Sequence, residues 1–276
     1  MKAHIETQNE LKNFSDLIQP ISIEEFENNY WEKRFLHIPR DNPDFFSSLF
    51  SIEDLDKVLE YNRPQGSSLK VVKSNQPMNP SIYENKDESL NLNQLYVAYA
   101  DGYSILINGI QRYWNPIKVL LENIRKQISH DLSANLYLTP ENEKAFSPHY
   151  DSHDVFAIQI SGKKHWILYD DARFKTPLLN SYQPTFQREQ LTNATEITMC
   201  AGDILYIPRG VPHEAYTTDK SSMHITIGIQ STQWIDFITK SLLSVSQKYI
   251  GLRKALPIGF LRSDHDNLLS DELQLE

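Results

Sequence analysis

From Ser133 onward, the chain is a series of short segments rich in β-forming residues, and this series constrains its fold most. The segments read ANLYLT, VFAIQI, HWILYD, EITM, ILYIP and HITIGI, and Pro, Gly and Asp turns separate them. Strands this short and this frequent are typical of a β-barrel or a β-sandwich. We therefore expect a mainly β core, with a hairpin turn at Ser161 and Gly162 between the second and third segments.

Helical patterns precede this core. Ser22 and Ser51 each stand before a periodic apolar segment and have an acidic residue three positions later, which is the pattern of a helix N-cap. Residues 115–129 predict a further helix, with Asn115 as its cap and Pro116 in its first position. The apolar face of this helix contains Ile117, Leu120, Leu121, Ile124 and Ile128.

The pattern divides the chain into three parts. Residues 1–132 predict an N-terminal helix and strand region that packs on the core, and its segment 62–93 reads as a long loop with one strand near residues 69–72. Residues 133–232 predict the β core. Residues 233–276 predict a C-terminal helical segment, with a helix from Trp234 to about Tyr249 and an acidic tail from Ser263. Phe237, Leu242 and Val245 give that helix an apolar face, which packs either on the core or on a second copy of the chain.

Composition excludes several classes of protein. With 276 residues, 40% hydrophobic and 23% charged, the chain is neither disordered nor fibrous. No apolar run approaches the ~18 residues of a membrane span, and the polar start is unlike a signal peptide. The net charge of −9 and the lack of a basic cluster argue against direct nucleic-acid binding and favour a basic peptide as partner. We expect a cytoplasmic protein that does not bind membranes.

The single cysteine limits the chemistry further. Cys200 cannot form a disulfide within the chain, and one thiol cannot build a multi-cysteine zinc or iron–sulfur site. Because it stands before an Ala-Gly-Asp turn, we expect its side chain to be a small buried filler rather than a nucleophile.

Two segments of the core carry candidate metal ligands. In SPHYDSHDVF, His149 and Asp151 are two positions apart, so in a strand both side chains would project from the same face. In GDILYIPRGVPHEA, His213 follows a Pro-Arg-Gly turn and can return beside that pair. Two His and one carboxylate form the facial triad, which leaves coordination positions open and suits Fe(II) in oxygen chemistry. A structural zinc site is usually closed and often rich in thiolates.

Other readings of these residues remain open at this point. His149 and Asp151 alone are compatible with a surface hydrogen bond. A rival ligand set consists of His149, His153 and His213. His224 in HITIGI is a further histidine of the core, so residue chemistry alone does not fix the ligands. We prefer Asp151 because a carboxylate partly neutralises the charge of the metal, and because residues at i and i+2 need no irregularity in the strand.

Taken together, these segments resemble a known family. The HxD motif, the GKKHW segment, GDILYIPRGVPH and HITI are similar to those of the JmjC-type 2-oxoglutarate oxygenases. The similarity is closest to their ribosomal-oxygenase branch, whose characterised members hydroxylate His or Arg side chains of ribosomal proteins. It extends from about Ile21 to Arg262. It implies a double-stranded β-helix core, the jelly roll of cupins and JmjC proteins.

The resemblance also implies roles for individual residues. His149, Asp151 and His213 match the iron ligands, and Lys164 matches the basic residue that pairs with the distal carboxylate of 2-oxoglutarate. Asn135, Tyr137 and Thr226 match positions near that cosubstrate. The residues by themselves also allow a solvated lysine at 164, an Asn135 that caps a bulge, and ordinary core aromatics at Tyr137 and Trp166. Trp166 is assigned no role in the site.

The resemblance predicts an Fe(II)- and 2-oxoglutarate-dependent enzyme that uses O2 to hydroxylate a side chain in a protein or peptide. The substrate would be a ribosomal protein or a biosynthetic precursor peptide, and the products would include succinate and CO2. The branch usually continues from a helical dimerisation region into a winged-helix domain. Residues 234–249 match only the start of that region, and we expect no winged helix, which puts a ribosomal substrate in question. The alternatives are a non-catalytic cupin-type peptide-binding module and a JmjC N-methyl-lysine demethylase.

Overall fold

The computed structural model describes residues 11–87, 89–178, 185–256 and 258. The chain divides into two units, Met1–Ser231 and Thr232–Glu276, which are considered separately below. The polar start of the chain, the acidic tail from Ser263 and part of the LRKALPIGFL segment lie outside the described residues.

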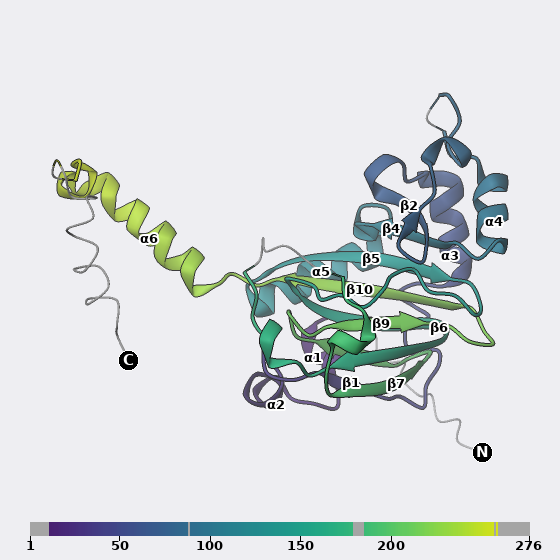
Figure 1. The fold of residues 1–276 in the computed structure, drawn as a ribbon, viewed down its shortest axis with the longest axis horizontal. Helices are drawn as coiled ribbons and strands as arrows, with labels where there is room; N and C mark the ends of the chain where they lie inside the picture. Colours follow the sequence, from purple (N-terminus) through teal and green to yellow (C-terminus); the bar gives the residue numbers. More distant parts are fainter. Residues whose placement is uncertain (1–10, 88, 179–184, 257, 259–276) are drawn as a thin grey trace, which may run out of the picture. The chain divides into compact units, whose positions relative to one another are not determined.

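The first unit is built on an antiparallel sheet, which confirms the expected mainly β core. Its strands are hydrogen-bonded in the order β1-β8-β6-β10-β5-β4-β2-β3, and β7 and β9 both pair with β6 off this path. Figure 1 shows β1 and β7 at the opposite end of the sheet from β2 and β4. The strands are β1 Leu36–Ile38, β2 Leu69–Lys73, β3 Gln76–Pro77, β4 Ser104–Asn108, β5 Asp131–Thr139, β6 Asp154–Tyr169, β7 Ala194–Cys200, β8 Ile204–Ile207, β9 His213–Tyr216 and β10 Ser222–Gln230.

Strand β6 is a single strand, so the hairpin expected at Ser161 and Gly162 was wrong. Its first half pairs with β8 and β10, and its second half, from Lys163 onward, pairs with β7 and β9. Gly162 has φ +70°, and a Cβ on it would lie 1.9 Å from the carbonyl oxygen of Ser221. Since glycine alone accepts this backbone and this contact, the strand bends here and changes its partners without turning back.

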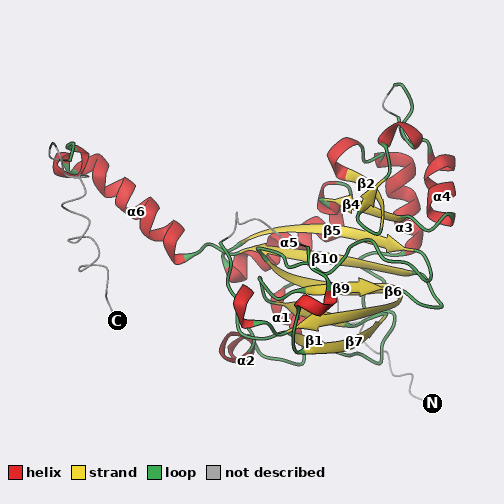
Figure 2. Cartoon of the chain, in the orientation of Figure 1, coloured by secondary structure: helices red, strands yellow, loops and turns green. Residues whose placement is uncertain are grey.

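Helices pack around the sheet of the first unit (Figure 2). The α-helices are α1 Phe14–Ile18, α2 Ile23–Asn29, α3 Ile52–Lys57, α4 Leu92–Ala100 and α5 Asn115–Ile128. Single 3-10 or π turns cover Val58–Asn62, Gly66–Ser68, Pro80–Ile82, Ile110–Arg112, Ala172–Phe174 and Arg188–Gln190. An aromatic cluster joins Phe14 and Phe26 of the helices to Phe156 and Tyr206 of the sheet, with ring centroids 4.8–5.8 Å apart.

The helix caps largely follow the sequence pattern. The Ser22 hydroxyl accepts a hydrogen bond from the Glu25 N–H, and Ser51 and Asp54 form a reciprocal capping box. In α5 the cap position belongs to Trp114 and Asn115 is the first helical residue, so the helix begins one position earlier than predicted. The predicted apolar face of α5 is confirmed, since its first four members are buried and Ile128 is partly buried.

Two features of the first unit were not expected. Helix α4 and strand β4 lie in and just after a segment read as loop. The signal for α4 was Asn91, whose side chain accepts from the N–H of Gln94 as an N-cap.

Cys200 is exposed at the end of β7, so its prediction as a buried filler was wrong. Side chains alternate between the two faces of a strand, and its neighbour Met199 takes the buried position.

The second unit contains helix α6, Trp234–Lys248, and a 3-10 turn over Ile250–Arg253. Considered within this unit, α6 has no buried residue. Its exposed large apolar side chains are Trp234, Ile235, Phe237, Ile238, Leu242, Leu243 and Val245. Among the described helices, none is both long enough and apolar enough to cross a lipid bilayer.

We predict that Gly162→Ala lowers the melting temperature by at least several degrees. The left-handed backbone costs an alanine ~1–2 kcal/mol, and the collision with Ser221 adds to that cost. Gly66→Ala is the matched control, because Gly66 also has positive φ but has no atom within 4 Å of the added Cβ. Thermal unfolding measures both variants, and equal shifts would contradict this account of the bend in β6.

Candidate metal centre

Two backbone hydrogen bonds hold His149 and His213 side by side. The His149 N–H donates to the His213 carbonyl at 3.0 Å, and the His213 N–H donates to the His149 carbonyl at 2.7 Å. The two imidazole rings consequently lie 4.7 Å apart between centroids. His213 begins β9, whereas His149 lies in an extended segment before β6 that forms only isolated bridges. The assumption that His149 and Asp151 lie in a regular strand was therefore wrong.

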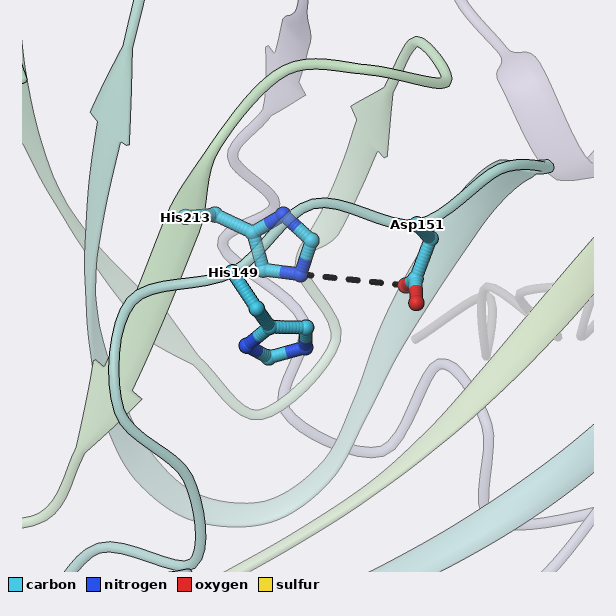
Figure 3. Close-up of side chains that lie close together, drawn as sticks. All are labelled: His149, Asp151 and His213. Carbon is cyan, nitrogen blue, oxygen red and sulfur yellow. Dashed lines mark ion pairs between the residues drawn. The ribbon is translucent and has the colours of Figure 1, made fainter. Parts of the chain in front are cut away.

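A turn places Asp151 opposite this pair. The N–H of Gly210 donates to the Asp151 carbonyl at 2.9 Å, within the Pro-Arg-Gly turn that leads to His213. The Asp151 Oδ2 atom lies 3.8 Å from the His213 Nε2 atom, as the dashed line in Figure 3 shows. One ligand atom from each of His149, Asp151 and His213 lies within 4.8 Å of the others. Two neighbouring positions and a third, 62 residues after Asp151, thus meet at one point.

The backbone also orients both imidazoles. The Nδ1 atom of His149 lies 2.9 Å from the Ser147 carbonyl, and that of His213 lies 3.0 Å from the Val211 carbonyl. Because a carbonyl only accepts, each Nδ1 carries the hydrogen and each Nε2 keeps a free lone pair. Burial, and then the nearby His149, lowers the pKa of His213 to about 4. A neutral imidazole is the form that binds a metal.

The donor set has the chemistry of an open metal site. Two imidazole nitrogens and one carboxylate oxygen suit Fe(II) and related divalent ions, and they leave positions for other ligands. His153, which belonged to the rival set, lines the same cavity but is not part of the three-residue cluster.

The cluster opens into a cavity of about 140 Å³. Every residue predicted for the site lies on its wall, together with eight others, among which Thr139, His153, Trp166 and His224 carry polar groups. The wall is formed by Asn135, Tyr137, Thr139, Ala145, Phe146, His149, Asp151, His153, Val155, Lys164, Trp166, His213, Ala215, His224 and Thr226. Alternation along strands would have indicated three of the four, since Thr139 follows Tyr137, Trp166 follows Lys164 and His224 precedes Thr226 by two positions.

Lys164 is the one lysine on this wall, and its side chain is buried. The residue is 2% exposed, whereas its neighbour Lys163 points to solvent. Its Nζ donates to the Thr139 hydroxyl at 2.8 Å, and no ion pair joins it to a carboxylate of the described residues. Burial lowers the pKa of Lys164 to about 7. An ammonium group in this position needs an anion, because burying it unpaired is costly.

Further polar atoms at the cavity wall lack partners. The Nδ1 atom of His224 and the Nε1 atom of Trp166 are buried and form no hydrogen bond in the described part of the chain. His224 stacks on Tyr137 with centroids 4.8 Å apart and planes at 5°. Together with Lys164, these groups fit a small anion with several oxygen atoms.

Asn135, Tyr137 and Thr226 sit on the paired strands β5 and β10. Asn135 and Thr226 are register partners, and the Asn135 side chain accepts from the N–H of Gly109 at 3.0 Å. This hydrogen bond uses the Asn135 Oδ1 atom and fixes the orientation of the side-chain amide. Burial, and then the charge of Asp151, raises the pKa of Tyr137 to about 12, which keeps the phenol protonated.

Part of the chain matches a known protein family. Residues 111–237 match the family model of the JmjC domain. This segment belongs to the JmjC domain family. The resemblance drawn from its sequence motifs is confirmed, and the sheet described above is the core of a JmjC fold.

This chain has relatives whose similarity extends beyond the matched segment. It is 30% identical over 268 residues to the bifunctional lysine-specific demethylase and histidyl-hydroxylase NO66 of Aedes aegypti, covering 92% of this chain and 42% of that protein. The NO66 protein of Dictyostelium discoideum is 29% identical, with coverages of 94% and 52%. The chain thus spans about half or less of the length of these relatives.

Solved structures give the same fold. The X-ray structure of E. coli ycfD has a TM-score of 0.54 and 19% identity, and the match covers 92% of this chain and 67% of that one. A structure of the ribosomal oxygenase YcfD in complex with cobalt and 2-oxoglutarate has a TM-score of 0.52 at the same identity, covering 92% and 66%.

We predict that two variants separate the two halves of the site. His213→Ala removes a ligand and abolishes tight binding of Co(II), whereas Lys164→Ala leaves Co(II) binding intact and weakens 2-oxoglutarate by at least tenfold, because it removes the buried cation. Calorimetry without O2 measures both affinities. His165→Ala is the control, since His165 bonds to Thr198 and Thr218 outside the cavity wall. Unchanged Co(II) binding in His213→Ala would contradict the ligand assignment.

Proposed function

We propose that the chain is an Fe(II)- and 2-oxoglutarate-dependent oxygenase that hydroxylates a side chain of a protein or peptide. The observation that carries this proposal is the combination of an open cluster of two His and one Asp with a buried lysine that has no anionic partner. A structural metal site would not need that lysine. A cosubstrate with a metal-binding end and a distant carboxylate accounts for both features.

His149, Asp151 and His213 would hold the iron, and Lys164 with Thr139 would hold the far carboxylate of 2-oxoglutarate. When bound, iron and 2-oxoglutarate supply the oxidising chemistry that places one oxygen atom of O2 into a C–H bond, with succinate and CO2 as further products. The protein contributes the geometry. The carbonyls of Ser147 and Val211 keep both imidazoles in the ligating tautomer.

The aromatic wall would exclude water from the reacting atoms. Trp166 lies 5.9 Å from His213 between ring centroids and contacts His224 edge-on at 5.5 Å. Tyr137 closes the same side by stacking on His224. Its protonated phenol and the Thr226 hydroxyl are donors for a bound carboxylate. Exclusion of bulk water strengthens each of these electrostatic contacts.

Names of the relatives support a protein as substrate. NO66 proteins carry the printed names of a histidyl-hydroxylase and a lysine-specific demethylase, and YcfD is described as a ribosomal oxygenase. A ribosomal protein and a biosynthetic precursor peptide are thus both candidate substrates, and the net charge of −9 favours a basic one. Demethylation of an N-methyl-lysine is the second candidate, because the same relatives are named for it. In this proposal residues 133–232 form the catalytic core, flanked by residues 1–132 and 233–276.

The test combines cosubstrate turnover with intact mass. Protein loaded with Fe(II) should convert 2-oxoglutarate to succinate, and peptides from ribosomal proteins or precursor peptides should gain the mass of one oxygen atom. Loss of a methylene unit from a methylated peptide, with release of formaldehyde, would favour demethylation instead. His213→Ala should give neither product. Iron-loaded protein that never forms succinate would leave the non-catalytic binding module as the better explanation.

We also propose that α6 contacts a second copy of the chain. Its apolar side chains are exposed within their unit; Phe237, Leu242 and Val245 are 43–58% exposed. Apolar faces of this kind mark contact surfaces. Sedimentation at micromolar concentration should give a dimer, and Leu242→Glu should give a monomer. A monomeric wild-type protein would remove this proposal and favour packing of α6 on its own chain.

A further inference from the structure

His153 is an imidazole on the cavity wall that the proposed chemistry does not use. It follows the ligand Asp151 by two positions, just before β6 begins, and it is half-buried. Its side chain forms no hydrogen bond or ion pair among the described residues. It is not one of the clustered ligands either. A ring with two polar nitrogens at the wall of a reaction cavity is therefore available to a bound molecule.

The sheet makes room for this ring at one position. Gly228 lies near the end of β10 and pairs with both β5 and β6. A Cβ on it would come within 2.6 Å of the His153 Cδ2 and 2.7 Å of its Nε2. The φ of Gly228 is not positive, so the backbone itself does not require glycine. A glycine inside a strand costs ~0.5–1 kcal/mol relative to alanine. The need for space beside the imidazole explains why it stands here.

The ring of His153 lies in line with the cavity-lining side chains of β10. His224 and Thr226 line the cavity, and Gly228 is the next residue on the same face of that strand. The ring of His153 thus takes the place that a side chain at 228 would otherwise fill. It adds a hydrogen-bonding group to the cavity wall beside Gly228, four positions along β10 from His224, whose neighbour is Lys164.

The charges in the cavity indicate which kind of substrate side chain would lie beside the His153 ring. Asp151 and Lys164 are the two wall residues with opposite formal charges, and a divalent ion and the dianion of 2-oxoglutarate would balance each other. The loaded cavity would then have no spare charge for a charged substrate group, and burying one unpaired is costly. A neutral side chain that forms hydrogen bonds, such as a carboxamide or an imidazole, fits this cavity best.

We propose that His153, seated against Gly228, is the specificity-determining residue that hydrogen-bonds the neutral polar side chain of the substrate. This proposal rests on the proposed function, since it assumes that a peptide side chain enters the cavity. It assigns His153 to substrate recognition rather than to the metal or to the cosubstrate.

The experiment measures peptide retention on immobilised protein with Mn(II) and 2-oxoglutarate, without O2. Four peptide pools share random flanks and differ in one central residue, which is His, Asn, Arg or Leu. Wild-type protein should retain the His or Asn pool about tenfold better than the Leu and Arg pools, the effect of one good hydrogen bond. His153→Phe keeps a ring without nitrogens and should lose this preference.

Two further variants separate recognition from packing. Gly228→Ala should displace the imidazole, lower the melting temperature and lose the preference, and Gly228→Ala combined with His153→Ala should recover stability without recovering the preference. His165→Phe, outside the cavity wall, is the control and should keep the preference.

The assignment is overturned by an unchanged preference in His153→Phe, or by a wild-type protein that shows none. Loss of 2-oxoglutarate binding in His153→Phe would also overturn it, because the residue would then act on the cosubstrate. These outcomes are separate from those of the proposed function. The proposed function is contradicted if the wild-type protein forms no succinate. Retention of the peptide pools is a binding measurement that needs no turnover.

Discussion

The paired backbone hydrogen bonds between His149 and His213 are the contact on which the site depends. They join a segment before β6 to the start of β9, so two imidazoles from distant parts of the chain become neighbours. The turn at Gly210 then adds Asp151 through one more backbone bond. Because backbone groups position all three side chains, the candidate ligands are held in place by the fold itself. Such preorganisation is what an open metal site requires.

The bend at Gly162 lets one strand serve both halves of the core. Before the bend, β6 pairs with β8 and β10, and after it, with β7 and β9. Lys164 follows the bend directly and points inward, across from Thr139 of β5. The same strand thus begins three residues after Asp151 and brings the buried cation to the cavity. One continuous strand thus links the candidate metal ligands to the candidate anion-binding lysine.

Several parts of this site follow from local pattern. Spacing and the Pro-Arg-Gly turn favoured His149, Asp151 and His213 over a rival set that contained His153. The family resemblance then matched these three residues to iron ligands and added Lys164. Local sequence pattern gave the wrong prediction where strand pairing decides the structure. Ser161 and Gly162 read as a hairpin because glycine with a small polar neighbour favours turns, and only the pairing of β6 on both sides shows that the strand continues. Burial of Cys200 likewise depended on which face of β7 meets the core.

The sequence by itself determined the mainly β core, the caps at Ser22 and Ser51 and the apolar face of α5, because periodicity and capping act over a few residues. It narrowed the candidate ligands to His149 and His213 with either Asp151 or His153. Tertiary structure alone decided that His153 lies outside the metal cluster, that Lys164 lacks a carboxylate among the described residues, and that Gly228 makes room for an imidazole. Each of these depends on distances between segments far apart in the chain. Such distances are set by strand register and close packing, which no local pattern encodes.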